Sequence, residues 1–333
     1  MVTGGRSGST ALSDALHAHP SVLSVSEWFA CLGGPFAFQL AALDGATFVD
    51  QVSTPLASHS WMIERHAEPS EFSYRFGERS RFSRQTGLPP ILVVPISRLA
   101  PQAADEIFDE LCAHMSDQPT RPLGAQHEVA FTWLAQRLSR DVWVERSGGS
   151  YAWAPSLCEH FPNARFIHLH RSSAAVVQSM SRHRGFQLAL AGFDAFMATG
   201  IHPYLMPGPV VPACPDEEVA ALWPDRLDLE ELDRRSTPER FGDFWTFMTS
   251  QAATALGSLP PDRVLHVAYD ALAASPADTL ERIAAFIGIE PGSSWLQLAA
   301  ATFEPRPPKG VADELVRACA PGDEVIRALV NQA

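Results

Sequence analysis

A segment rich in glycine and serine near the start of the chain has the composition of an anion-binding loop. It reads Gly4-Gly5-Arg6-Ser7-Gly8-Ser9-Thr10 and leads directly into residues with helical spacing of apolar side chains. Glycines let backbone N–H groups turn inward, and a helix N-terminus carries about half a positive charge, so both features favour an anion. The hydroxyls can donate hydrogen bonds, and Arg6 supplies a cation. Taken alone, the segment fits a tight turn without a ligand equally well.

An arginine that follows a predicted strand is a second candidate for binding a phosphate. The apolar stretch 164–170 predicts the strand, Arg171 comes next, and Ser179 lies eight residues further on in a predicted helix. Ligands of parallel α/β sheets bind at the carboxyl ends of strands, and the fork of an arginine matches a phosphate. By itself, this pattern is more often a surface arginine and a helix serine.

Strands and helices alternate around these residues. Residues 10–17 predict a helix, and two later stretches continue the alternation: strand 142–144, turn 147–149, helix 153–161, strand 164–170 and a helix from Ala174, then strand 264–269 and helix 276–287. This order predicts βαβ units and an α/β fold with a mainly parallel sheet flanked by helices. The apolar run 91–96 predicts a further strand, at an edge or cut short by Pro95.

The strand before the glycine loop has only residues 1–3 available. Because strands usually have about five to six residues, either this strand is short or residues upstream of it are missing.

Composition excludes several classes of function. The 333 residues carry a net charge of −13, which argues against a broad grip on nucleic acid. The only lysine is Lys309, so the lysine-dependent phosphate loop GxxxxGK[ST] is absent.

Cysteine usage and hydropathy favour a cytoplasmic protein without a metal site. The five cysteines are widely spaced and form no CxxC pair, which argues against a disulfide framework and against zinc. No apolar run approaches the roughly 18 residues of a membrane span, and no signal peptide is visible.

Together, these motifs resemble the sulfotransferases that use 3′-phosphoadenosine 5′-phosphosulfate, in particular bacterial members with an arginine in the phosphate loop. Segment 5–12 resembles the family's 5′-phosphosulfate loop, and His170-Arg171 with Ser179 resembles its 3′-phosphate motif. Segments 144–147 and 264–272 resemble further parts of its sheet. The resemblance implies a P-loop-kinase-like fold, transfer of a sulfuryl group to a hydroxyl or amine, adenosine 3′,5′-bisphosphate as product, and no metal.

The resemblance also assigns roles to individual residues. Arg6 is expected to act in catalysis as well as in binding, by stabilising charge on the group in transfer. The residues expected to bind the donor are Gly5, Arg6, Ser7, Gly8, Ser9, Thr10, Arg171, Ser179 and Tyr269. Lys309 is similar to a late basic residue of the family, and Arg146 and Ser147 are candidates for contact with the donor.

Glu27 matches the position of the proposed general base in members with an arginine-type loop, shortly after His19-Pro20. Its neighbours Trp28 and Phe29 would partly desolvate it and raise its pKa. A solvated loop glutamate or a partner for an arginine is equally compatible with the sequence. The alternative bases are His127, His59 and His66.

We expect a single domain over residues 1–333, with insertions at about 36–140 and 185–240 that shape the acceptor site. The aromatic residues Phe193, Phe196, Tyr204 and Trp223 either line that site or form the core of a cap. The acceptor is predicted to be a small molecule, glycan or lipid, and the sequence leaves the oligomeric state open.

Two other functions compete with sulfuryl transfer. One is an ATP-dependent kinase of related fold, which would need a phosphate cation other than the Walker lysine. The other is a nucleotide-binding protein that kept the fold and lost turnover.

Overall fold

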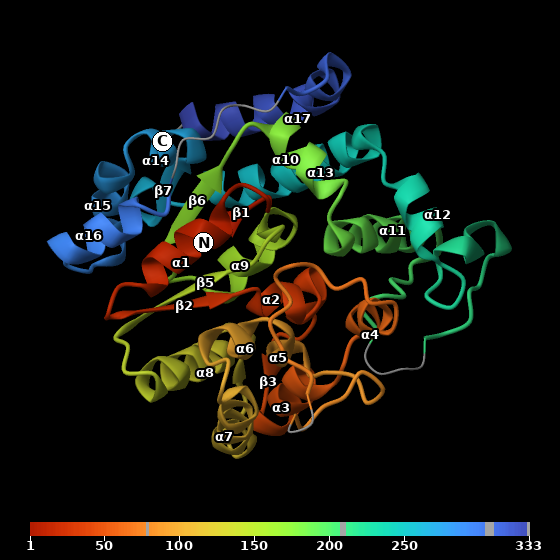
Figure 1. The fold of residues 1–333 in the computed structure, drawn as a ribbon, viewed down its shortest axis with the longest axis horizontal. Coiled ribbons are helices and arrows are strands. Elements are labelled where there is room, and N and C mark those ends of the chain that lie inside the picture. The colour runs from red at the N-terminus through yellow and green to blue at the C-terminus, as the bar shows by residue number, and fades with distance from the viewer. Residues whose placement is uncertain (78–79, 207–210, 304–309, 332–333) are drawn as a thin grey trace.

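The computed structural model describes residues 1–77, 80–206, 211–303 and 310–331. Its centre is a parallel sheet with the N-terminus in the middle (Figure 1). Strands β1 (Val2–Thr3), β6 (Phe166–His170) and β7 (Val264–Ala268) pair in that order, and β2 (Val22–Ser26) pairs with β5 (Val142–Arg146). The backbone nitrogen of Met1 donates to the carbonyl of Glu145 at 2.6 Å, which places β5 beside β1. The strands therefore follow the spatial order β2-β5-β1-β6-β7.

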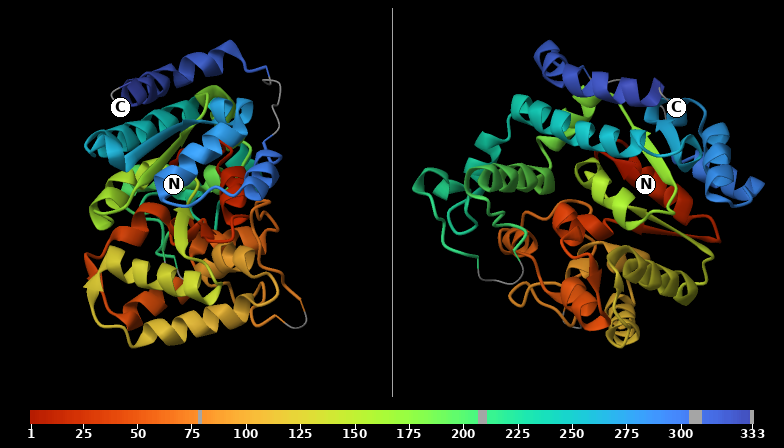
Figure 2. Two further views of the ribbon diagram at one scale, coloured as in Figure 1. Left: turned by 90° about the vertical axis from the view of Figure 1, so that its left-hand side faces the viewer. Right: turned by 180° about the vertical axis from the view of Figure 1, so that it is seen from behind.

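Helices cover both faces of this sheet (Figures 1 and 2). Alternate residues of β6 face opposite ways: Ile167 and Leu169 join one apolar cluster, whereas Phe166 joins the other. The first face packs against α1 (Ser9–His17), α14 (Tyr269–Ala274), α15 (Pro276–Ile287) and α16 (Ser293–Ala300). The second packs against η2 (Ser150–Trp153), α9 (Ala154–His160), α10 (Ser173–Met180), α13 (Pro238–Gly257) and α17 (Asp313–Asn331). This confirms the predicted α/β class with a mainly parallel sheet.

The first insertion contains mostly helices. Between β2 and β5 the chain forms α2 (Trp28–Cys31), η1 (Gly34–Phe38), β3 (Ala42–Leu43), α3 (Gly45–Ser53), α4 (Ala57–Glu64), α5 (Pro90–Val93), α6 (Pro95–Leu99), α7 (Ala104–Ser116), β4 (Arg121–Pro122) and α8 (Leu123–Arg137). The short η4 (Pro261–Arg263) lies outside this insertion and directly precedes β7.

The second insertion contributes α11 (Arg184–Thr199), η3 (Glu217–Leu222) and α12 (Leu229–Arg235), and it packs on the first. Trp61 and Met62 of α4 share an apolar cluster with Tyr204 and Trp223, and the Trp61 indole donates to the carbonyl of Leu227 at 3.3 Å. Side chains from the two insertions thus build one body beside the sheet.

The strand predicted at 91–96 is wrong. These residues form the two short helices α5 and α6, each with a proline in its first turn. A proline there loses no helical hydrogen bond, because the first N–H groups of a helix have no partner within it. The run is buried from Ile91 to Ile96, so its side chains give no periodicity that separates a helix from a strand.

The described residues contain no helix with the length and apolar character needed to cross a membrane. All five cysteines are free thiols.

Candidate functional site

The glycine loop joins β1 to α1 in a conformation that only glycine adopts easily at two positions. Gly5 and Gly8 have φ angles of 85° and 86°. A Cβ at Gly5 would lie 2.4 Å from Phe186 Cζ, and a Cβ at Gly8 would lie 2.1 Å from a ring carbon of Tyr269. The loop therefore forms a close cradle of backbone at the start of α1, where an anion is favoured.

The hydroxyls of the loop have different surroundings. The Ser7 hydroxyl is buried and shares a 2.5 Å hydrogen bond with the Thr3 hydroxyl, which also accepts from the Gly5 amide at 3.3 Å. Ser9 is also buried, whereas Thr10 is half-buried. Ser7 thus stabilises the turn itself, and Thr10 is the more accessible hydroxyl.

Arg6 connects the loop to two other segments of the chain. Its Nε donates to Ser179 Oγ at 3.0 Å, and its Nη1 lies 2.5 Å from Glu71 Oε1. The structure therefore brings Ser179, which was predicted to assist Arg171, into direct contact with Arg6. Glu71 was not predicted, because it lies in an irregular part of the first insertion without a motif or a periodic pattern.

Glu71 is itself held by His183, the residue before α11. Their Nε2 and Oε2 atoms lie 3.1 Å apart, and the carboxylate also accepts from the Ser70 hydroxyl. The hydrogen bond from His183 holds the pKa of Glu71 well below its ordinary value, and the positive charge of Arg6 adds to this effect. Glu71 is therefore a charged group in contact with the predicted cation of the loop.

Arg171 and Tyr269 lie together on the other side of the loop. The Arg171 guanidinium carbon is 4.6 Å from the centre of the Tyr269 ring, a cation–π distance. The same ring packs against Gly8. Two residues predicted from separate strand ends thus meet at the glycine loop.

Glu27 follows β2 in a left-handed conformation, with a φ of 60°. One carboxylate oxygen forms an ion pair with Arg146, and the other accepts from the Gly148 amide at 2.8 Å. The next amide, that of Gly149, lies 3.1 Å from where a Cβ of Gly5 would be. Glu27 therefore lies at the same end of the sheet as the loop, and its ion pair with an arginine is one of the alternatives left open by the sequence.

Arg146 is the buried partner of this ion pair. Its side chain is 2% exposed, its Nη2 donates to the Ser26 hydroxyl at 3.2 Å, and its Nε has no hydrogen-bond partner among the residues that the structure describes. Glu145 lies beside it in β5, where burial raises its pKa to about 7. Neither Arg146 nor Glu145 has open access to solvent.

Removing Arg146 is expected to destabilise the protein strongly. Arg146→Ala should lower the free energy of unfolding by about 3 to 5 kcal/mol, because it leaves Glu27 without its buried partner and opens a cavity. Urea denaturation measures this value. The control is Arg137→Ala, which removes a more exposed ion pair with Glu110 and should lower the free energy of unfolding much less. Equal losses in the two variants would contradict the burial argument.

The histidines considered as alternative bases lie elsewhere. His127 is fully buried, its Nδ1 accepts from the Trp28 indole at 3.2 Å, and burial lowers its pKa to about 3. His59 is also buried, with a pKa lowered to about 4. His66 is exposed at the end of α4. His127 and His59 therefore have the surroundings of core residues, and His66 has those of a surface residue.

The aromatic residues of the second insertion divide into two groups. Tyr204 and Trp223 are buried in the core of the cap, where each donates a 2.6 Å hydrogen bond to a backbone carbonyl. Phe193 packs against Phe247, and Phe196 is 41% exposed. Of these four aromatic side chains, Phe196 is exposed and Phe193 is half-buried.

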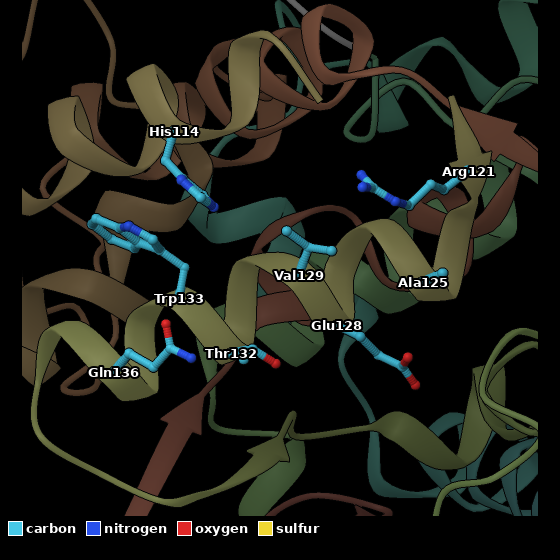
Figure 3. A pocket seen from close by; sticks show the side chains of 8 residues that line it. All are labelled: His114, Arg121, Ala125, Glu128, Val129, Thr132, Trp133 and Gln136. Carbon is cyan, nitrogen blue, oxygen red and sulfur yellow. The ribbon is translucent and has the colours of Figure 1, made fainter. Parts of the chain in front are cut away.

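A surface pocket of about 400 Å³ lies between α7 and α8 (Figure 3). It is lined by His114, Arg121, Ala125, Glu128, Val129, Thr132, Trp133 and Gln136. None of the predicted site residues contributes to it. Lys309 lies outside the described residues, and within them no group of three or more His, Cys, Asp or Glu is arranged to hold a metal ion.

Comparison with known proteins identifies relatives of this chain. The model of the sulfotransferase family matches residues 1–202. Among curated protein sequences, none matches this chain significantly.

Solved structures similar to this one include three sulfotransferases. The sulfotransferase domain from the curacin biosynthetic pathway has 13% identity and a TM-score of 0.46, and the match covers 96% of this chain and 95% of that one. The sulfotransferase domain of the Synechococcus PCC 7002 olefin synthase has 14% identity, a TM-score of 0.43 and coverages of 96% and 91%. Sulfotransferase STF9 from Mycobacterium avium has 13% identity, a TM-score of 0.45 and coverages of 100% and 76%.

Proposed function

Because this chain belongs to the sulfotransferase family, we propose that it transfers a sulfuryl group from 3′-phosphoadenosine 5′-phosphosulfate to an acceptor hydroxyl or amine. The observation that carries this proposal is the set of contacts around the glycine loop. Arg6 contacts Ser179, and Gly8 contacts the Tyr269 ring on which Arg171 lies. Residues far apart in the sequence thus surround one turn of backbone that suits an anion.

The donor fits this arrangement in two parts. The backbone amides of the loop and the Arg6 side chain suit the 5′-phosphosulfate. At Gly5 and Gly8, Phe186 and Tyr269 approach so closely that the chain has room there for backbone without a side chain. Arg171 suits the 3′-phosphate, since a guanidinium can donate two parallel hydrogen bonds to a phosphate. In this assignment the Tyr269 ring keeps the Arg171 guanidinium in place.

The donor supplies a sulfuryl group whose bond to the phosphate oxygen breaks as the bond to the acceptor oxygen or nitrogen forms. By analogy with phosphoryl transfer, most of the catalysis is positioning and stabilisation of charge. Arg6 and the loop amides would stabilise the charge that develops on the leaving phosphate. Glu27 would take the acceptor proton; two of its lone pairs are engaged by Arg146 and Gly148, which fix its orientation.

The acceptor is proposed to be a small molecule, glycan or lipid that enters beside the two insertions. Phe196 is exposed on α11 and lies 6.3 Å from Phe36, measured between ring centres. An apolar acceptor surface would suit these side chains. A screen of phenols, aliphatic alcohols, sugars and amines with labelled donor would identify the class.

Donor selectivity tests the proposed function directly. Adenosine 3′,5′-bisphosphate is expected to bind at least about 30-fold more tightly than ADP, because a charge-assisted contact of Arg171 to the 3′-phosphate is worth roughly 2 kcal/mol or more. Isothermal titration calorimetry measures both affinities. Adenosine 2′,5′-bisphosphate has nearly the same charge and is the matched control. Equal affinity for all three nucleotides would contradict the proposal and return the ATP-dependent kinase to consideration.

A further inference from the structure

Glu71 occupies the place beside Arg6 where an anion of the donor is expected. We infer that Glu71 is an internal counter-ion that competes with the donor for Arg6 and thereby sets donor affinity. This inference rests on the proposed function, in which Arg6 binds the phosphosulfate. It adds a specificity-determining residue, from the first insertion, to the loop motif.

The contact between the two side chains is a close and partly shielded ion pair. Nη1 of Arg6 and Oε1 of Glu71 are 2.5 Å apart, and the side chains are 31% and 19% exposed. Arg6 is the only charged residue of the loop 4–10. With Glu71 in contact, the loop keeps its backbone amides but has no net positive charge from side chains.

The carboxylate is anchored from its other side. His183 and the Ser70 hydroxyl both donate to Oε2, each at 3.1 Å, and the Ser73 hydroxyl donates to the Glu71 carbonyl at 2.7 Å. The His183 ring also contacts Phe186, the side chain that covers Gly5. Glu71 is thus placed at the loop by groups other than Arg6.

Orientation of Arg6 does not require Glu71. The Nε atom of Arg6 already donates to Ser179, which fixes one edge of the planar guanidinium. The contribution of Glu71 is therefore mainly its charge. A phosphosulfate that binds Arg6 meets a carboxylate within a few ångströms, and like charges at this distance repel. The donor must displace Glu71 or bind against its repulsion.

The test is Glu71→Gln, which keeps the shape and removes the charge. Its affinity for adenosine 3′,5′-bisphosphate, whose 5′-phosphate would contact Arg6, is expected to rise roughly tenfold, measured by calorimetry. The control is Glu68→Gln, because Glu68 lies three residues earlier and pairs with Arg84 instead. The affinity of the Glu68→Gln variant for adenosine 3′,5′-bisphosphate should stay within about twofold of that of the unaltered protein.

A second pair of variants separates charge from structure. In an Arg6→Gln background, Glu71→Gln should raise the affinity by less than about threefold, because only direct repulsion of the phosphate by Glu71 is then removed. Glu71→Asp in the unaltered background should keep the weaker binding of the unaltered protein. If Glu71→Gln does not fold, His183→Ala releases the carboxylate from its anchor and should raise the affinity about threefold.

Unchanged or weaker binding in Glu71→Gln, or an equal gain in the Arg6→Gln background, overturns the inference. Failure of the proposed function gives a different result, because the unaltered protein would then bind ADP as tightly as the bisphosphate. A protein that prefers the bisphosphate but does not respond to Glu71→Gln refutes only the role of Glu71.

Discussion

Replacing Glu27 by glutamine is expected to lower turnover by about 100-fold or more, because a positioned general base contributes roughly 10²- to 10⁴-fold to a rate. Affinity for adenosine 3′,5′-bisphosphate should stay within about twofold, since Glu27 faces Arg146 and Gly148 rather than Arg6. Steady-state assays with saturating donor measure the first effect, and calorimetry measures the second. The split between turnover and donor binding is what distinguishes a base from a residue that only supports the loop.

The ion pair of Glu27 with buried Arg146 requires a matched control. Glu27→Gln leaves Arg146 without its charged partner, so the free energy of unfolding must be measured and the assay run well below the unfolding transition. Glu145→Gln changes a neighbouring buried carboxylate that accepts hydrogen bonds from the Ser147 hydroxyl and the Phe29 amide. It should retain turnover within a few-fold. Full activity in Glu27→Gln, or an equal loss in both variants, would rule out Glu27 as the base.

Replacing Arg171 by alanine is expected to weaken binding of adenosine 3′,5′-bisphosphate by about 30- to 100-fold, while ADP affinity changes less than about threefold. The reason is that Arg171 is the side chain assigned to the 3′-phosphate, which ADP lacks. Arg171→Lys keeps the charge but loses the fork and should show an intermediate loss. The acceptor KM should not change.

Arg165 provides the comparison for Arg171. It lies just before the other end of β6, also stacks on an aromatic ring, that of Phe286, and donates to the Phe286 carbonyl at 2.7 Å. Arg165→Ala should leave the affinity for both nucleotides within about twofold. Similar losses for the bisphosphate and ADP in Arg171→Ala would contradict a role at the 3′-phosphate.

The parts of the fold that were predicted correctly are those with a local signal. Helix α15 begins at Pro276 and ends before Gly288, the residue types that favour these two positions, and its bounds agree with the prediction. Strands β5, β6 and β7 are short, mostly apolar runs, and all three were found, although Tyr269, predicted to end β7, begins helix α14. The helices at 90–99 were missed because a fully buried run has no period. Strand β2 was missed because two of its five residues are serines, although all five are buried.

The candidate site residues that could be proposed from the sequence are those in continuous motifs, namely the loop and Arg171. The contacts of Glu71 with Arg6 and of Arg146 with Glu27 join segments 65 and 119 residues apart, and nothing local in the sequence encodes such pairs. Ser179 was assigned correctly to a helix after Arg171, but its contact with Arg6 depends on how α10 packs beside the loop.

The apolar cluster shared by the two insertions also constrains how the enzyme can be re-engineered. Trp61 and Met62 pack with Tyr204 and Trp223, and backbone amides of Ala57 and Ser58 donate to carbonyls of Met206 and Tyr204. A chimera that exchanges only one insertion with a relative would expose half of this interface. Both insertions must therefore be transplanted together if the exchanged chain is to fold stably.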